Sequence, residues 1–336
     1  MADVRDPWRW RPLTGMPLDA HEWLAPEYET LVAEWVNLKD RLAKDTRAAA
    51  FVEDRLTKRQ REFAVETGAI ERLYHLRRGV TQHLVAEGLH TAVAAHTVEG
   101  VQTETLRGLL ADQEAGLEVV SRDTAADAEI SPAMLKRWHA LLVRNQETVT
   151  GMTRDGVLGQ VPFTEKGVWK TQPNNPSILS SCEGFPLALP GKGVFEYCPP
   201  ESVADEVDRL CTLYSRIRKE RFPVHAEAAW LHHRFARTHP FQDGNGRVSR
   251  LLMASCYSRR GLVPPLLRAD GREDYFDALQ RADASDLKSF SRYIAVQASA
   301  AQLAANTAAQ NALAGQMEDP PPNGARTIGE TYHEPP

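Results

Sequence analysis

Apolar residues recur at three- and four-residue spacing along most of this chain, and this repeat favours a fold built mainly from helices. In the segment 58–78, for example, Phe63, Thr67, Ile70 and Tyr74 form one stripe. The same pattern predicts helices in the ranges 19–42, 58–78, 81–95, 104–120, 131–142, 200–213, 224–237, 247–261, 273–281 and 287–313.

Residues 150–200 interrupt the helical repeat, because glycine and proline become frequent there. β-Branched and aromatic residues indicate two short strands, Val168–Thr171 and Val194–Tyr197. A turn signal at Pro173–Pro176 would also allow the first strand to fold back onto Ile178–Leu179. We therefore expect a mainly α fold, a helical bundle with a small β-hairpin flap at about 161–198.

Composition excludes several classes of protein. With 336 residues the chain can bury a large core, and its net charge of -5 argues against nucleic acid as a partner. No apolar run approaches a membrane span, and the N-terminus lacks the apolar core of a signal peptide. The four cysteines show no CxxC spacing, so we expect free thiols in a cytoplasmic protein.

One stretch of twelve residues, 239–250, concentrates the side chains that phosphate chemistry needs. The sequence Gly-Asn-Gly at 244–246 precedes a helix, where backbone N–H groups and the helix N-terminus can converge on an anion. Arg247 and Arg250 share one face of that helix and suit a di- or triphosphate. Asp243 offers a carboxylate of the kind that binds Mg²⁺, and His239 offers a base with a near-neutral pKa.

Each of these residues alone has an ordinary structural explanation. An isolated Asp-Gly-Asn-Gly is usually a surface turn, and a histidine before proline is usually structural. The joint occurrence at fixed offsets favours a site, with Phe241 as the residue that anchors the loop to the core.

The stretch resembles the Fic family signature, His-x-Phe-x-(Asp/Glu)-Gly-Asn-Gly-Arg-x-x-Arg, and agrees with it at every specified position. The resemblance covers about residues 60–300 and implies a Fic-type helical bundle. Most Fic proteins transfer the AMP part of ATP to a hydroxyl side chain of a target protein and release pyrophosphate. The resemblance therefore implies ATP as a substrate, Mg²⁺ as a cofactor and a protein target with a modifiable Tyr, Thr or Ser hydroxyl. Kinase-like members carry lysine where this chain keeps Gly246, which disfavours that variant.

The resemblance also assigns roles to single residues. His239 would deprotonate the target hydroxyl, and Asp243 would bind Mg²⁺. The remaining motif residues would hold the phosphates, with the second arginine on the terminal one: Gly244, Asn245, Gly246, Arg247 and Arg250.

Two further segments are similar to regulatory and docking elements of the family. Thr67 to Glu71 resembles the inhibitory pattern (Ser/Thr)-x-x-x-Glu-(Gly/Asn), although Arg72 departs from its last position. Glu99-Gly100 is a weaker alternative, because Ala95 occupies its Ser/Thr position, and the inhibitory role of Glu71 is favoured over that of an ordinary surface carboxylate. The flap residues Val168, Trp169 and Lys170 would dock the target by strand addition, or would form a purely structural hairpin.

These features predict three regions. Residues 1–57 form an N-terminal helical region, and residues 58–300 form a Fic-type catalytic domain that includes the inhibitory helix, about 58–78, and the flap. Residues 301–336 hold the end of the last helix and a disordered tail.

The predicted function is that of an autoinhibited protein adenylyltransferase. The alternatives are removal of AMP, transfer from another nucleotide, and a non-catalytic nucleotide-sensing module. The target and the presence of a homo-oligomer stay open.

Overall fold

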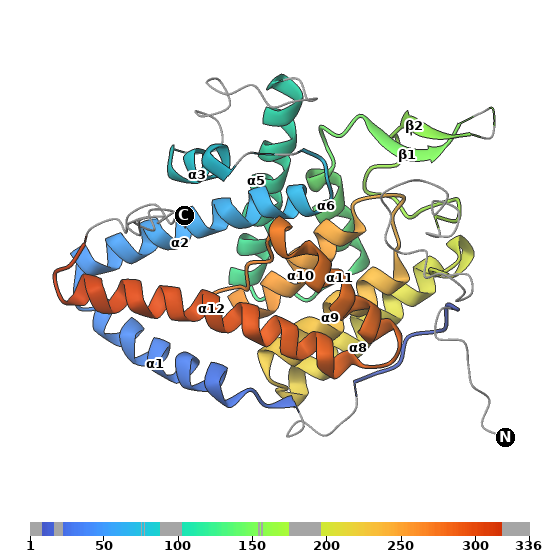
Figure 1. Ribbon diagram of the computed structural model, residues 1–336. Coiled ribbons are helices and arrows are strands. Elements are labelled where there is room, and N and C mark those ends of the chain that lie inside the picture. The colour runs from blue at the N-terminus through green and yellow to red at the C-terminus, as the bar shows by residue number, and fades with distance from the viewer. Residues whose placement is uncertain are drawn as a thin grey trace, which may run out of the picture.

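The computed structural model describes residues 9–16, 23–74, 76, 78–87, 103–153, 155, 157–174 and 196–317. Within them helices dominate, accompanied by one two-stranded antiparallel sheet (Figure 1). The predicted mainly α fold with a small hairpin is thus confirmed. None of the helices in these ranges has the length and apolar character needed to cross a bilayer.

The helices and strands follow one another along the whole described chain. In order they are α1 Pro26–Leu42, α2 Thr46–Ile70, α3 Arg78–Glu87, α5 Thr103–Ala125, α6 Pro132–Leu142, β1 Thr148–Met152, β2 Leu158–Pro162, a 3₁₀ turn Pro200–Ser202, α8 Val203–Glu220, α9 Val224–Thr238, α10 Asn245–Ser258, a 3₁₀ turn Ala269–Gly271, α11 Arg272–Asp283 and α12 Leu287–Leu313.

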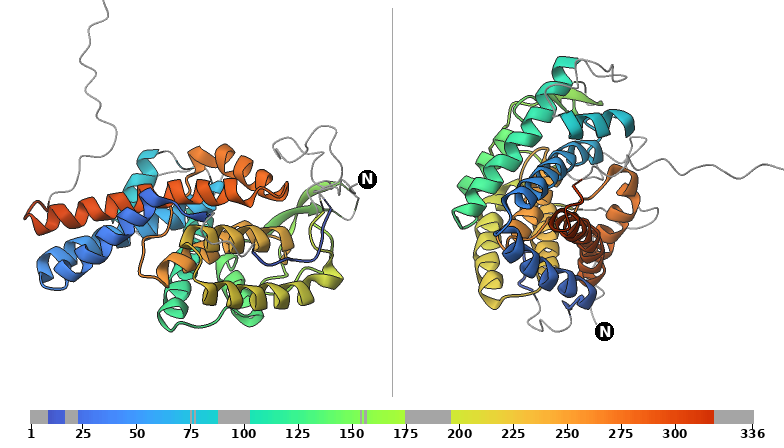
Figure 2. Two further views of the ribbon diagram at one scale, coloured as in Figure 1. Left: turned by 90° about the horizontal axis from the view of Figure 1, so that it is seen from below. Right: turned by 90° about the vertical axis from the view of Figure 1, so that its left-hand side faces the viewer.

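Helices α9 and α10 form the centre of the bundle, because almost every side chain on them is buried. Helix α9 packs against α8, α10 and α12, and α10 also contacts α2, α5 and α6. The long α12 lies alongside α1 and α2 (Figure 2). Its buried face carries Ala298, Ala301, Ala305 and Ala309, whose small side chains allow neighbouring helices to approach closely.

The sheet lies upstream of the predicted flap. Strands β1 and β2 pair antiparallel with Thr148 opposite Pro162 and Gly151 opposite Gly159. Glycines at 151 and 159 hide the alternation of apolar and polar residues by which a strand is recognised in sequence. The hairpin stands away from the helical body (Figure 1).

The strand predicted at Val168–Thr171 is wrong, since this segment is irregular. The backbone N–H of Lys170 donates to Pro240 O at 2.8 Å, in the loop after α9. In the second predicted strand, Glu196 and Tyr197 are also irregular. The first half of that strand, and the alternative partner Ile178–Leu179, lie outside the described residues, as do parts of the ranges 19–42 and 81–95 and most of the predicted tail.

Helix α2 ends at Ile70, eight residues before the predicted end of that helix. Arg72 adopts a left-handed conformation with φ of 57°, and the N–H of Leu73 turns back to Gly68 O at 3.2 Å. The chain then folds Tyr74 over the helix, where its hydroxyl donates to Val65 O at 2.9 Å. A Cβ on Gly68 would lie 2.2 Å from that hydroxyl oxygen, so the glycine provides the space that Tyr74 occupies.

The substitution Gly68→Ala tests this packing. Helix propensity alone would stabilise the protein by about 1 kcal/mol. Overpacking against Tyr74 should instead destabilise it by about 1–3 kcal/mol. Urea unfolding measures the free energy of unfolding of the variant and of the unchanged protein. In a Tyr74→Ala background, where the added methyl has room, the same substitution should be neutral or stabilising, and an equal loss in both backgrounds would contradict this explanation.

Candidate active site

The predicted base lies directly after α9. His239 ends that helix in a left-handed conformation, with φ of 48°, and its N–H donates to Phe235 O at 2.9 Å. Pro240 follows and prevents the helix from continuing. The imidazole is thereby placed at the start of the loop that leads to α10.

The loop is closed by its own side chains. Asn245 accepts the N–H of Phe241 at 2.9 Å through Oδ1 and donates to Phe241 O at 2.8 Å through Nδ2. The Phe241 ring is fully buried and stacks on His139, with ring centroids 3.7 Å apart and an interplanar angle of 3°. The amide predicted to bind phosphate is therefore engaged in holding the shape of the loop.

His139, on α6, fixes the middle of the loop. Its Nε2 lies 2.9 Å from Asp243 O, and its Nδ1 accepts the N–H of Gly167 at 2.9 Å. Because the carbonyl can only accept, Nε2 carries the proton. Gly244, with φ of 79°, leaves room for this ring, since a Cβ there would lie 3.1 Å from His139 Cδ2.

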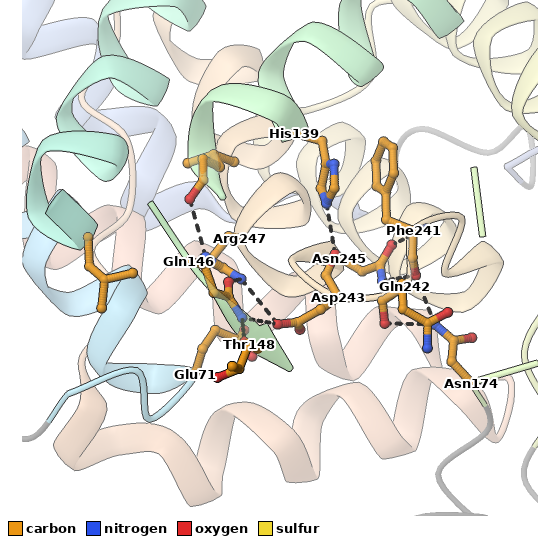
Figure 3. Close-up of polar contacts among 12 residues, drawn as sticks. Glu71, His139, Gln146, Thr148, Asn174, Phe241, Gln242, Asp243, Asn245 and Arg247 are labelled. Carbon is orange, nitrogen blue, oxygen red and sulfur yellow. Dashed lines mark hydrogen bonds and ion pairs between the residues drawn. The ribbon is translucent and has the colours of Figure 1, made fainter. Parts of the chain in front are cut away.

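Among the described residues, the side-chain partners of the Asp243 carboxylate all contact one of its oxygens, Oδ2. Its Oδ2 accepts Gln146 Nε2 at 2.6 Å and lies 3.4 Å from Arg247 (Figure 3). Burial favours the protonated form, but Arg247, Gln146 and the Gly244 N–H outweigh it and hold the pKa of Asp243 below its usual value. With 39% of its side chain exposed, this anionic group is accessible to a cation.

The guanidinium of Arg247 points into the protein. It donates to Leu142 O at 3.2 Å and to Gln146 Oε1 at 2.6 Å, and its side chain is fully buried. These contacts indicate that Arg247 braces the start of α10 against the end of α6. The phosphate role of this residue stays a prediction.

Arg250 joins α10 to the end of α2. Its Nε donates to Thr67 Oγ1 at 2.8 Å, and its second amino group donates to Thr67 O at 3.0 Å and to Glu71 Oε1 at 2.6 Å. Among the described residues, no hydrogen-bond partner lies within reach of its remaining amino nitrogen, which is buried. Thr67 and Glu71, the two residues of the predicted inhibitory pattern, thus meet Arg250 of the motif at one point.

The Glu71 carboxylate lies directly over Gly246. A Cβ on Gly246 would be 2.1 Å from Glu71 Oε1, and Gly246 is in the first turn of α10. The backbone N–H groups of a first turn have no partner within the helix and attract anions. Glu71 therefore occupies the position that the sequence assigns to a phosphate.

The His239 ring is held in one tautomer. Its Nδ1 lies 3.1 Å from Ala236 O and must carry the proton, which leaves Nε2 as an acceptor. Tyr197 covers the ring face, with centroids 3.7 Å apart and planes at 6°. Burial and the charge of Lys170 lower the pKa of His239, against the opposing effects of Ala236 O and Asp243, so the ring is neutral at pH 7.

The predicted docking residues Val168, Trp169 and Lys170 do not form a strand edge. Trp169 packs on Phe241, with ring centroids 4.9 Å apart. Lys170 is 2% exposed and donates to Asn174 Oδ1 at 2.7 Å. Lys170 therefore supports the loop from within, and of the three only Val168 is well exposed.

Sequence reasoning missed three residues of the site: His139, Gln146 and Tyr197. All three are remote from the motif in sequence, and none belongs to a chemical pattern of its own. The only available signal was for His139, four residues after Leu135 on the apolar face of its helix. A polar side chain there needs a buried partner.

The residues present fit a magnesium–nucleotide. Among the described residues no group of three or more His, Cys, Asp or Glu gathers to hold a metal ion by itself. Mg²⁺ is commonly bound by one or two carboxylates together with substrate phosphates, and the partly exposed carboxylate of Asp243 provides one. The Arg250 guanidinium and the first turn of α10 suit the phosphates.

The pH dependence of stability tests the role of His139. Burial lowers its pKa to about 4 despite its contact with Asp243, so the unfolded chain binds more protons between about pH 6.5 and pH 4. Stability should fall as pH decreases through this window, by about 3 kcal/mol from this residue. In urea unfolding, His139→Phe should be less stable at pH 7 but show a shallower slope. An unchanged slope would contradict the assignment.

Comparisons with known proteins agree with the motif. The Fic/DOC family matches residues 129–256. Protein adenylyltransferase Fic of Aedes aegypti is 44% identical over 68 residues, which is 20% of this chain and 14% of that protein. Protein adenylyltransferase fic-1 of Caenorhabditis briggsae is 35% identical over 104 residues, 31% of this chain and 20% of that protein. The matched segments thus span at most a fifth of the length of these relatives.

The fold similarity extends further than the sequence similarity. A Fic domain-containing signaling protein of Bacteroides thetaiotaomicron aligns with a TM-score of 0.61 and 20% identity, over 86% of this chain and 98% of that chain. Fic-1 of Caenorhabditis elegans aligns with a TM-score of 0.58 and 20% identity, over 84% of this chain and 71% of that chain. Residues 129–256, which contain the complete motif, are thus a Fic/DOC family domain, and the fold around them is shared with these solved structures.

Proposed function

We propose that this chain is an autoinhibited protein adenylyltransferase, which moves AMP from ATP to a Tyr, Thr or Ser hydroxyl of another protein. One observation carries the proposal: a neutral histidine and an anion-binding helix start share one loop, and the chain's own Glu71 lies on that helix start. The relatives named protein adenylyltransferases support transfer of AMP as the reaction class.

In the proposed reaction His239 acts as general base. Its Nε2, the free acceptor of the ring, takes the proton of the target hydroxyl. The hydroxyl oxygen forms a bond to the α-phosphorus of ATP, the bond from that phosphorus to the β-phosphate oxygen breaks, and pyrophosphate leaves. Because Tyr197 and Ala236 O hold the ring, little reorganisation precedes the proton transfer.

The phosphates are held by the start of α10 and by Arg250. The first-turn N–H groups face the anion, and the guanidinium of Arg250 adds a full positive charge. Asp243 would hold Mg²⁺, which neutralises phosphate charge when bound. His139 and Asn245 keep the loop in the conformation that presents these groups.

Glu71 inhibits by occupying the same place. Its carboxylate accepts from Arg250 and covers Gly246, so a terminal phosphate would meet a negative charge at contact distance. Two like charges in a partly buried site repel strongly. ATP must therefore displace Glu71 or bind with its phosphates misplaced.

Removing the carboxylate tests the inhibitory role. Glu71→Gly should raise labelling of the chain itself, or of a target in a lysate, by at least about tenfold, because about 1.4 kcal/mol of relief gives that factor. Mass spectrometry would detect the AMP increment and its site. Glu53→Gly, at an exposed position of the same helix, controls for the effect of a glycine. Unchanged or lower labelling by Glu71→Gly would remove Glu71 from the role.

The general base is tested in the same background. Glu71→Gly/His239→Ala should lose transfer almost completely while its affinity for ATP stays within about threefold, because the imidazole acts on the hydroxyl and not on the phosphates. Calorimetric titration with ATP measures the binding. Transfer that survives the loss of the imidazole would contradict the assignment.

A panel of nucleotides resolves the remaining alternatives. Labelling with ATP, GTP, CTP and UTP in the Glu71→Gly variant identifies the transferred group. Loss of AMP from a premodified target on addition of the unchanged chain would favour removal instead of transfer. Nucleotide binding without any transfer by the Glu71→Gly variant would favour a nucleotide-sensing module.

A further inference from the structure

Gln146 links two motif residues and belongs to neither the motif nor a neighbouring helix. It lies between α6 and β1 and is 7% exposed. Its Nε2 donates to Asp243 Oδ2 at 2.6 Å and to Thr148 O at 3.1 Å, and its Oε1 accepts from Arg247 at 2.6 Å (Figure 3). Both the nitrogen and the oxygen of this side-chain amide are thus hydrogen-bonded.

The orientation of this amide is determined by its neighbours. A guanidinium can only donate, so the atom facing Arg247 must be the amide oxygen. A carboxylate and a carbonyl can only accept, so the atom facing Asp243 and Thr148 must be the nitrogen. The flipped amide would oppose all three partners, so Gln146 has one state in this site.

The amide also separates a buried cation from the carboxylate. Arg247 lies 3.4 Å from Asp243 Oδ2, a long contact, whereas its hydrogen bond to Gln146 is 2.6 Å. Without the amide, the fully buried guanidinium would lose an acceptor and Asp243 would lose a donor. Arg247 and Asp243 would then form a direct ion pair, since a guanidinium and a carboxylate readily make two parallel hydrogen bonds.

We propose that Gln146 is a positioning residue that keeps one oxygen of Asp243 available to a magnesium–nucleotide. It donates to Oδ2 and holds Arg247 away from the carboxylate, which leaves Oδ1 without a side-chain partner among the described residues. Because Gln146 also donates to the first residue of β1, the hairpin and the Asp243 carboxylate are positioned together. This inference rests on the proposed function, since it concerns the same nucleotide.

The experiment measures binding and does not depend on turnover. In the full chain carrying Glu71→Gly, the variant Gln146→Met keeps the volume of the side chain and removes its hydrogen bonds. Calorimetric titration gives the Kd of ATP with Mg²⁺ and with EDTA. We expect Gln146→Met to raise the Kd in Mg²⁺ by about tenfold, equivalent to about 1.4 kcal/mol, and the Kd in EDTA by less than twofold. Transfer assays should show a matching rise in the Mg²⁺ concentration needed for half-maximal rate.

Controls make the result specific. Gln160→Met alters another glutamine amide, which is exposed on β2 and contacts Thr150, and should leave both Kd values unchanged. An unchanged affinity in EDTA shows that Gln146→Met is folded; if it does not fold, Gln146→Ala gives the same comparison. Equal weakening with and without Mg²⁺ indicates a general structural role and overturns the inference.

The two proposals fail in different ways. Suppose that Mg²⁺ lowers the Kd of ATP for the Glu71→Gly parent, and lowers it by the same factor after Gln146→Met or Gln146→Ala is added. The inference about Gln146 is then wrong, and the proposed function stands. If the parent binds no nucleotide, both are wrong.

Discussion

The buried guanidinium of Arg250 imposes the constraint on which the site depends. A charge that is only 1% exposed needs acceptors around it, and the end of α2 supplies them from Thr67 and Glu71. Helix α2 is therefore fixed against α10 where α10 begins. The same helix is also held by the segment 268–272. This segment contacts three positions of α2 that are four residues apart: Glu62, Glu66 and Ile70.

The same arrangement explains why glycine stands at positions 244 and 246 of the loop. The first turn of α10 attracts an anion, and the protein provides its own in Glu71. A side chain at Gly246 would meet that carboxylate, and one at Gly244 would meet His139. Each glycine thus leaves space for a specific neighbour from another helix.

The contiguous part of the site could be predicted from sequence, and the remote part could not. Spacing alone indicated the anion site of residues 239–250, because loop and helix start are local features. The resemblance to a known family singled out Thr67 and Glu71, which the structure brings to Arg250. By contrast, Gln146 became visible only when α6 and α10 were placed side by side, since one glutamine carries no pattern.

The errors in the fold have the same origin. The apolar and β-branched residues of Val168–Thr171 predict a strand. Trp169 and Lys170 instead pack beneath the loop between α9 and α10, because tertiary contacts outweigh local propensity. The helix predicted to run to residue 78 stops at Ile70, where Tyr74 folds back over Gly68. Long helices with a strong apolar stripe, such as α9 and α12, were predicted with nearly correct ends.

The order of the contact partners along the chain has a consequence for biosynthesis. Glu71 precedes Arg250 by 179 residues, so it leaves the ribosome long before the motif is complete. Under the proposed function, no nascent chain carries the phosphate-binding arginine without already carrying its inhibitor. Newly made protein would enter the cell in the inactive state, and activity would require a later event that moves one helix end.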